Sequence, residues 1–247
     1  MLLCVFADGL TEMVFKRSLS RQVIDSLGLS IVRGDFQAGD ALPNEADLSA
    51  GLGVSRTVTR EAIKVLSEKG LVEARPKVGT LVLPRARWNQ LDADILNWEY
   101  EAGPRDQFLV RLTEVRRIIE PAAARLAAER ATDAEIAAIE RDYQAMALCV
   151  DDINQYIAVD LQFHAHIVQA SHNELLEQIV NTIRAALIAS RKVTTQIPGG
   201  ARAALPLHYA VLNAIRQHEP AQAEDAMTAL ISRAFADIQR IISANHP

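Results

Sequence analysis

Residues 51–66 read GLGVSRTVTREAIKVL, and this stretch decides the fold of the first third of the chain. It opens with a tight turn at Gly51-Leu52-Gly53, where glycine permits backbone angles that other residues avoid. Ser55 then offers the side-chain oxygen that caps a helix N-terminus. We expect the helix that follows to run to about Lys69 and to stop at Gly70.

This helix carries a basic face. Arg56, Arg60 and Lys64 follow one another at intervals of four residues, so their side chains lie on one side of the helix. The opposite side is expected to pack against the rest of the domain, and it holds Val58, Ala62, Val65 and Leu66. The pattern predicts a helix that buries one face and presents positive charge on the other.

Two more helices are predicted before the turn. Residues 20–33 place apolar side chains near a 3.6-residue period, with Ser20 as the N-cap and Gly34 as the residue that ends the helix. Residues 44–50 form a second, short helix that Asn44 caps.

After the basic helix, the apolar period changes to that of β-strands. Residues 71–74 and 80–83 are short β-like runs, and Arg75-Pro76-Lys77-Val78-Gly79 joins them as a hairpin. Two helices, a glycine turn, a third helix and a hairpin follow one another in the order of a winged helix-turn-helix. We assign that domain to residues 16–84.

The N-terminal end of the third helix of such a domain enters the major groove of DNA. There an arginine pairs with O6 and N7 of guanine, and free backbone N–H groups attract phosphate. A lysine at the hairpin tip is placed to reach a phosphate or the minor groove. The candidate DNA-binding residues are Ser55, Arg56, Thr57, Arg60, Lys64, Lys77 and Gly79. A solvated basic helix on an unrelated domain would explain the arginines, but not the turn and the wing in this order.

Charge is unevenly divided along the chain. Residues 16–85 contain eleven basic and eight acidic residues, a net charge of +3, whereas the whole chain carries -5 and the remainder therefore -8. The division favours a head that meets a polyanion and a body that phosphates would repel.

Beyond the winged domain the sequence predicts helices only. Residues 85–104 form a linker and a linker helix, and residues 105–247 form an all-helical domain. We expect six or seven helices in this half, at about 91–102, 106–130, 133–150, 152–171, 174–196, 201–218 and 221–244. Pro121 should kink the second of them unless a helix starts there. The predicted fold class is mainly α, a winged helix-turn-helix followed by a helical bundle.

The winged domain resembles the GntR family of bacterial repressors over its whole length. The resemblance rests on Phe36-Gln-Ala-Gly-Asp-Ala-Leu-Pro-Asn-Glu-Ala-Asp-Leu48, Gly53-Val-Ser-Arg-Thr-Val-Thr-Arg-Glu-Ala62, Leu66-Ser-Glu-Lys-Gly-Leu-Val72 and Gly79-Thr80. It implies that Arg56, Thr57 and Arg60 contact the operator, that Ser55 supports them, and that the wing reaches the minor groove. The fatty-acid regulator of this family has an arginine contact in its second helix, where this chain has Ala46. That departure suggests a different operator.

The helical half resembles the FCD ligand-binding domain, which accompanies such heads in the FadR-like branch. The resemblance rests on Glu114-Val-Arg-Arg-Ile-Ile-Glu-Pro121, Asp160-Leu-Gln-Phe-His164, Asn173, His208 and Ala223-Glu-Asp-Ala-Met227. Within the branch, Trp88-Asn-Gln-Leu-Asp-Ala-Asp-Ile-Leu-Asn-Trp98 is most similar to D-galactonate-type regulators of sugar-acid catabolism. The resemblance implies a homodimer that represses a sugar-acid operon and leaves its operator DNA when a small carboxylate effector, such as an aldonic acid, binds.

A polar pocket is predicted in the helical half. Asp160 and His164 lie four residues apart and project from one helix face. Together with His208, from a later helix, they offer one oxygen and two nitrogen ligands suited to Zn, Ni or a similar divalent metal. The resemblance implies a fourth ligand, a histidine, where this chain has Leu230. Two outcomes stay open: a metal with three protein ligands, or no tight metal and direct hydrogen bonds to the effector.

Arg116 is the candidate for holding the effector carboxylate, because a guanidinium matches that group bidentately. The predicted effector-binding residues are Arg116, Asp160, His164 and His208. Arg191-Lys192 either line the mouth of the pocket or form a solvated basic end of a helix.

The rest of the sequence narrows the class of protein. No run approaches the ~20 apolar residues that cross a bilayer. Cys4 and Cys149 fit unpaired thiols in a reducing compartment, so we expect a cytoplasmic protein without a membrane partner. Residues 1–15 are expected to form a flexible extension, with Met13 as a second candidate for the start of translation.

Other functions are weighed against this one. A metal-dependent hydrolase built on the predicted metal ligands would need a nucleophile or a general base, which no motif supplies, and we therefore do not expect an enzyme. The sequence leaves open whether the regulator represses or activates. It also leaves open whether the effector is instead lactate, an amino acid or a fatty acid.

Overall fold

A computed structural model describes residues 18–103, 106–195, 197 and 199–245. The predicted extension at residues 1–15, Cys4 and the second candidate start at Met13 lie outside the described residues. The chain divides into two compact units, one ending at Asn89 and one beginning at Gln90. The described residues form eleven α-helices and one two-stranded sheet, which confirms the mainly α fold class.

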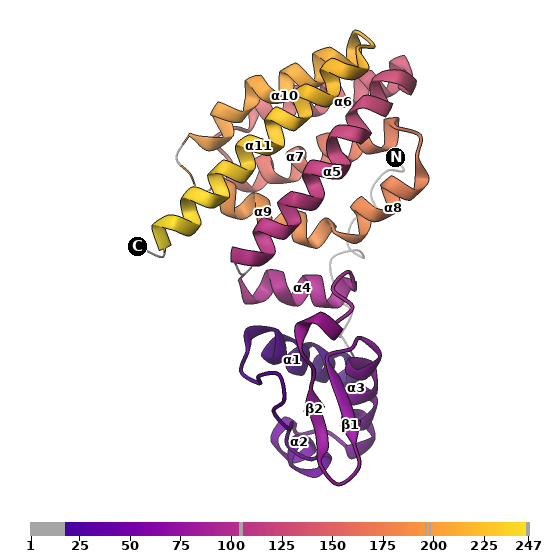
Figure 1. The fold of residues 1–247 in the computed structure, drawn as a ribbon, viewed down its shortest axis with the longest axis vertical. Coiled ribbons are helices and arrows are strands. Elements are labelled where there is room, and N and C mark those ends of the chain that lie inside the picture. Colours follow the sequence, from indigo (N-terminus) through magenta and orange to yellow (C-terminus); the bar gives the residue numbers. More distant parts are fainter. Residues whose placement is uncertain (1–17, 104–105, 196, 198, 246–247) are drawn as a thin grey trace, which may run out of the picture. The chain divides into compact units, whose positions relative to one another are not determined.

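The first unit, the head, has the predicted order of helices and hairpin (Figure 1). Its elements are α1 (Leu19–Arg33), α2 (Glu45–Leu52), α3 (Arg56–Glu68), β1 (Val72–Arg75), β2 (Gly79–Val82) and the 3-10 turn η1 (Arg85–Arg87). Asn44 and Ser55 cap α2 and α3 as predicted. The cap of α1 is Ser18 rather than Ser20, because the Ser18 hydroxyl accepts the backbone N–H of Arg21 at 3.2 Å and the helix starts earlier.

The core of the head forms where α1 packs on α3. Ala62 and Leu66 are fully buried as predicted, but Val58 and Val65 are only half-buried. The third helix instead buries Thr59 and Ile63. Thr59 is tolerated there because its hydroxyl shares a 2.9 Å hydrogen bond with the hydroxyl of Ser49, which ties α3 to α2. A polar residue with a hydrogen-bond partner thus takes a buried position that the sequence had assigned to the valines.

The hairpin pairs β1 with β2 antiparallel, from Val72 opposite Val82 to Arg75 opposite Gly79. At its tip, Lys77 (φ 64°) and Gly79 (φ 108°) both adopt left-handed backbone angles. Gly79 therefore permits the tight return, while Lys77 is a lysine in a conformation that favours glycine or asparagine. The lysine side chain is exposed at the end of the wing.

The segment after the wing folds back onto the head. Gly70 (φ 77°) lies so close to it that a Cβ atom there would be 2.3 Å from the carbonyl oxygen of Arg87. The indole N–H of Trp88 donates to the carbonyl of Leu83 at 2.9 Å, and the backbone N–H of Asn89 donates to Lys69 at 2.9 Å. The head thus extends five residues beyond the boundary expected at residue 84.

The second unit, the body, is entirely helical in its described part. Its helices are α4 (Ala93–Ala102), α5 (Asp106–Arg130), α6 (Asp133–Leu148), α7 (Ile153–Ala170), α8 (Glu174–Thr182), α9 (Arg184–Thr194), α10 (Gly200–Arg216) and α11 (Pro220–Asn245). The single helix predicted over 174–196 is two helices that meet at Ile183, where ψ is 6°. No glycine or proline stands at this break, so the sequence did not mark it.

Helices α5, α6, α7, α10 and α11 enclose the main core of the body. Figure 1 shows α5 and α11 running side by side, and α5 buries three alanines in this core, Ala124, Ala127 and Ala128. Small side chains let two helix axes approach closely. Helix α5 continues through Pro121 without a break. None of the described helices has the length and apolar character needed to cross a membrane.

Candidate functional site

The predicted DNA-binding residues all lie on the surface of the head. The hydroxyl of Ser55 caps the helix, because it accepts a hydrogen bond from the backbone N–H of Val58 at 3.3 Å. Arg56 and Thr57 form the first turn of α3 and are exposed. The first turn therefore presents a guanidinium and a hydroxyl beside the free backbone N–H groups of a helix N-terminus, which is an arrangement that attracts phosphate.

Arg60, one turn further along α3, is already engaged. Its Nη2 lies 2.8 Å from Oε2 of Glu45, at the start of α2, and its Nε lies 3.3 Å from both carboxylate oxygens. The hydrogen bond from Arg60 lowers the pKa of Glu45, and the same bond raises the pKa of Arg60. The pair is exposed, so the guanidinium can exchange its carboxylate for another anion without leaving water.

The remaining candidates flank this pair. Lys64 is exposed and lies 3.9 Å from Glu68 on its own helix. Lys77 and Gly79 form the tip and the return of the wing, as described above. Ala46, where the fatty-acid regulator of the family has an arginine, is half-buried on α2. The neighbouring side chain on this helix is the carboxylate of Glu45. Contact of these residues with DNA stays a prediction.

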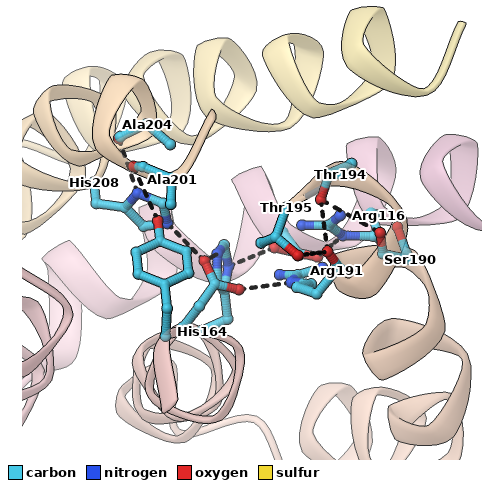
Figure 2. A network of polar contacts seen from close by, with 12 residues as sticks. Arg116, His164, Ser190, Arg191, Thr194, Thr195, Ala201, Ala204 and His208 are labelled. Atoms are coloured by element: carbon cyan, nitrogen blue, oxygen red, sulfur yellow. Dashed lines mark hydrogen bonds and ion pairs between the residues drawn. The ribbon is translucent and has the colours of Figure 1, made fainter. Parts of the chain in front are cut away.

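The second candidate site is a cavity in the body that opens to solvent and leaves about 60 Å³ for the centres of water-sized molecules. Its polar lining comes from five helices and one helix cap: Arg116 from α5, Tyr156, Asp160 and His164 from α7, Arg191 and Thr194 from α9, Thr195 as the C-cap of α9, His208 from α10, and Arg233 and Asp237 from α11. Figure 2 shows His164, Arg191 and His208 turned toward one another, with Arg116, Thr194 and Thr195 beside Arg191. The structure thus brings together all four predicted effector-binding residues, each of them buried.

Asp160 lies at the centre of the cavity wall. Its Oδ2 accepts Nε of Arg191 at 2.6 Å, and its Oδ1 lies 3.0 Å from Nε2 of His208 and 3.9 Å from Nε2 of His164. Burial alone would raise the pKa of Asp160, but the charge of Arg191 and the contact with His208 outweigh it and hold the pKa well below its usual range. Asp160 is therefore a carboxylate at neutral pH with both oxygens in use.

Glu120 is a second buried carboxylate, which sequence reasoning did not assign to the site. It accepts Nε of Arg116 at 2.5 Å, and its Oε2 lies 2.7 Å from Nδ1 of His164. Burial opposes ionisation here too, but Arg116 and His164 keep the pKa of Glu120 below its usual range. Burial lowers the pKa of His164, although Glu120 acts in the opposite direction. Arg116, the predicted carboxylate holder, is thus already paired with a carboxylate of the chain.

Arg191 lines the cavity, which is one of the two places that the sequence left open for it, but its burial and its pairing with Asp160 were not predicted. Its side chain is only 6% exposed and binds Asp160. Burial opposes its charge, but Asp160 and Glu120 raise its pKa, so it stays a cation. The spacing of residues gave one signal of this burial. Ile183, Ala186, Leu187 and Ser190 lie on one face of the helical stretch and are buried, and Arg191 continues the same face.

The metal ligands implied by the family are present in part. Asp160, His164 and His208 each offer a ligand atom, and these atoms lie within 4.8 Å of one another. The fourth position is Leu230, a buried apolar residue that lines the same cavity. Both oxygens of Asp160 are taken, one of them by the guanidinium of Arg191. These residues do not fit the four-ligand metal site that the resemblance implied.

Two other histidines of the described residues, His166 and His172, do not line the cavity. His166 points elsewhere, as its offset of two residues from His164 suggests, and its Nδ1 lies 2.5 Å from Oδ2 of Asp142. His172 contacts Glu135 on the surface, with Nε2 to Oε1 at 3.0 Å. Neither position adds a ligand to the three that converge.

Comparisons with known proteins identify the family of each of the two units. Residues 19–82 match the gntR family of bacterial regulatory proteins, and residues 111–233 match the FCD domain. The galactonate operon transcriptional repressor of Escherichia coli (strain K12) is 33% identical over 224 residues, covering 89% of this chain and 96% of that protein. The HTH-type transcriptional repressor NanR of Edwardsiella tarda (strain FL6-60) is 29% identical over 228 residues, 90% of this chain and 85% of that protein.

A solved structure shows the same fold. Lar, described as controlling expression of the Listeria monocytogenes agr system, superposes with a TM-score of 0.61 over 91% of this chain and 98% of its own, at 18% sequence identity. The relatives bear the names of transcription regulators, which excludes the hydrolase alternative. The chain belongs to the GntR family of bacterial transcription regulators, with an FCD domain as its body, and it is a DNA-binding regulator and not an enzyme.

Proposed function

We propose that this regulator is a cytoplasmic repressor of an operon for sugar-acid catabolism, and that a small carboxylate such as the aldonic acid galactonate releases it from its operator. The observation that carries the proposal is the cavity of the body, which is lined by guanidinium, imidazole and hydroxyl groups. The name of the galactonate operon repressor, a relative of similar length, supports the choice of ligand class.

In this proposal the protein acts as a homodimer. Two heads place their α3 helices in successive major grooves of a pseudo-palindromic operator, since dimers of helix-turn-helix proteins bind half-sites one helical turn apart. Arg56, Thr57 and Arg60 read or hold the groove, Ser55 fixes the start of the helix, and Lys64 adds charge. Lys77 and Gly79 carry the wing to the flanking phosphates.

The effector enters the cavity of the body and meets Arg116, Asp160, His164 and His208. The carboxylate of a sugar acid suits a guanidinium, and its hydroxyl groups suit the carboxylate and imidazole groups of the wall. Repression is relieved because the effector favours the arrangement of the two heads that does not fit the operator. This requires that the ligand bind that arrangement more tightly than the DNA-bound one.

A divalent metal such as Zn or Ni is the alternative way to hold the same ligand. In that case Asp160, His164 and His208 would supply three ligands and leave open positions for the effector or water. A different effector class is the second alternative. The polar wall of the cavity favours a hydroxylated acid over a fatty acid, because a buried apolar chain would leave these polar groups without partners.

The test uses the full-length protein and an operator selected from a random duplex library. Fluorescence anisotropy then measures operator binding while D-galactonate, D-gluconate, L-lactate, N-acetylneuraminate, amino acids and a fatty acid are added in turn, with and without a chelator. We expect an aldonic acid to weaken operator binding without added metal. Release by lactate, an amino acid or a fatty acid alone would overturn the sugar-acid assignment.

Two variants separate the halves of the mechanism. Arg60→Ala should weaken operator binding about 5- to 150-fold, as the loss of one bidentate base contact does, while ligand binding persists. Arg116→Lys should do the reverse, keeping a charge for Glu120 but losing the planar fork. A matched arginine on the body surface, Arg125→Gln, should leave both steps as in the wild type, because Arg125 is exposed and away from both sites.

A further inference from the structure

The guanidinium of Arg191 is only partly satisfied by the protein. Its Nε donates to Asp160 at 2.6 Å, and its side chain is buried against the cavity. Its two other nitrogens, Nη1 and Nη2, are also buried and have no hydrogen-bond partner among the described residues. Buried donors without partners are costly, and native proteins rarely leave them so without a ligand or water in place.

The free edge has the shape of an anion site. Nη1 and Nη2 form the end of a planar fork that matches the two oxygens of a carboxylate. Arg116 stands near it, and burial together with the charge of Arg191 lowers the pKa of Arg116. Glu120 and Asp160 balance the charges of these two guanidinium groups, so a further anion is favoured by the unpartnered Nη1 and Nη2 of Arg191 and not by excess charge.

We propose that Arg191 is the effector-binding cation of this pocket, which grips the ligand carboxylate through Nη1 and Nη2 and replaces the metal ion that the family's ligand set implies. The inference rests on the proposed function, since it names how the same cavity holds its small acid.

The donor set explains why a guanidinium stands where a metal is implied. A metal at Asp160, His164 and His208 would have to displace Arg191 from Oδ2 of Asp160. It would also find Leu230 in place of a fourth ligand, and a fixed positive charge within the same wall. A guanidinium that is part of the chain supplies a fixed positive charge without needing those ligands.

The remaining wall defines the class of acid. Around Arg191 lie the hydroxyl groups of Tyr156, Thr194 and Thr195, each of which keeps lone pairs that can accept a hydrogen bond. His208 donates Nδ1–H to the carbonyl of Ala204 at 2.9 Å, which fixes the ring and turns Nε2 toward the cavity side of Asp160. The ligand is therefore a small acid with several hydroxyl groups next to its carboxylate.

The experiment measures ligand binding by isothermal titration calorimetry on the full-length protein after treatment with a chelator. The probes are D-galactonate, D-gluconate, L-lactate and N-acetylneuraminate, and galactitol serves as the polyol without a carboxylate. The variants are Arg191→Lys, which keeps a charge for Asp160 but has no fork, and Arg191→Gln. Arg125→Gln is the matched control, and elemental analysis reports the metal content of each preparation.

We expect D-galactonate to bind the chelator-treated wild type and galactitol not to bind. Arg191→Lys should raise the dissociation constant at least ~10-fold, as the loss of one bidentate contact does, while its thermal midpoint stays near that of the wild type. Unfolding of Arg191→Gln alone would not change this result, because the lysine variant carries the test. Added Zn should leave the wild-type constant within ~2-fold.

Three results would overturn the inference. The first is that Arg191→Lys binds the acid with wild-type affinity. The second is that binding of the acid disappears after chelator treatment and returns with one equivalent of Zn. The third is that the wild type binds none of the four acids. If another acid binds in place of D-galactonate and depends on Arg191, the sugar-acid proposal fails while the role of Arg191 stands. If D-galactonate binds equally well without Arg191, the role of Arg191 fails while the sugar-acid proposal stands.

Discussion

Each candidate site contains an arginine paired with a carboxylate from another helix, and the two pairs differ mainly in their exposure to water. In the head, Arg60 and Glu45 lie 2.8 Å apart with side chains 72% and 38% exposed. In the body, Arg191 and Asp160 lie 2.6 Å apart with side chains 6% and 7% exposed. The same contact therefore serves two purposes. An exposed pair contributes little stability and exchanges partners easily, whereas a buried pair must stay together or leave a charge stranded.

The largest expected effect comes from breaking the buried pair. Asp160→Leu leaves Arg191 buried without its carboxylate, which should lower the free energy of unfolding by ~3–5 kcal/mol. The double variant Asp160→Leu, Arg191→Met removes both charges and should recover most of that loss. Urea denaturation at fixed protein concentration measures both. If the single variant stays within ~1 kcal/mol of the wild type, the pair does not behave as a buried one.

Removing the arginine of the exposed pair should affect DNA binding and not folding. Arg60→Ala should weaken operator binding about 5- to 150-fold, the range for losing one bidentate base contact. Its urea midpoint should match the wild type, because the pair is exposed to water. Fluorescence anisotropy with an operator duplex gives the affinity, and Arg125→Ala serves as the control. A large drop in the midpoint would mean that Arg60 holds the head together.

Removing the carboxylate of the exposed pair sharpens the comparison further. Glu45→Gln takes a negative charge away from the DNA-facing surface and frees Arg60 from its fixed orientation. Affinity for an unrelated duplex should rise about 2- to 5-fold, as expected for one fewer repulsive charge near phosphate, while operator affinity gains less. The ratio of operator to unrelated binding, measured at one salt concentration, should fall. A higher ratio would show that Glu45 only competes with the operator.

The smallest expected effect lies at the wing. Lys77→Asn removes one positive charge but keeps a residue that tolerates the left-handed backbone of the tip. The slope of log affinity against log salt concentration should become shallower by about 1, the value for one phosphate contact. Operator preference should not change. An unchanged slope would mean that Lys77 does not reach the DNA.

Most of the head could be predicted from the sequence because its signals are local. Caps, glycine turns and the change from helical to strand period lie within a few residues of the structure that they determine, as at Asn44, Ser55 and Gly70. One error in the head had a cause outside the helix concerned. Thr59 was not predicted as buried, because its partner Ser49 belongs to another helix and no pattern in α3 reveals it.

The cavity could be predicted only in part, for the opposite reason. Asp160 and His164 are four residues apart, so their shared face follows from helix geometry. The other two residues of the network depend on packing between distant helices. Arg191 is 31 residues from Asp160, and Glu120 meets His164 from another helix. A charged residue on a helix is most often solvated, and only the fold shows that these two are buried.

The closing of the head by residues 85–89 has a practical consequence. Because Gly70 admits Arg87 and Trp88 is anchored to Leu83, the head ends at Asn89, and only Gln90-Leu91-Asp92 precede the first helix of the body. A gene fused at the codon for Gln90 would therefore join the complete DNA-binding head of this regulator to the complete effector-binding body of a related one. The same junction serves for building reporter circuits in which the promoter is familiar and only the chemical input is new.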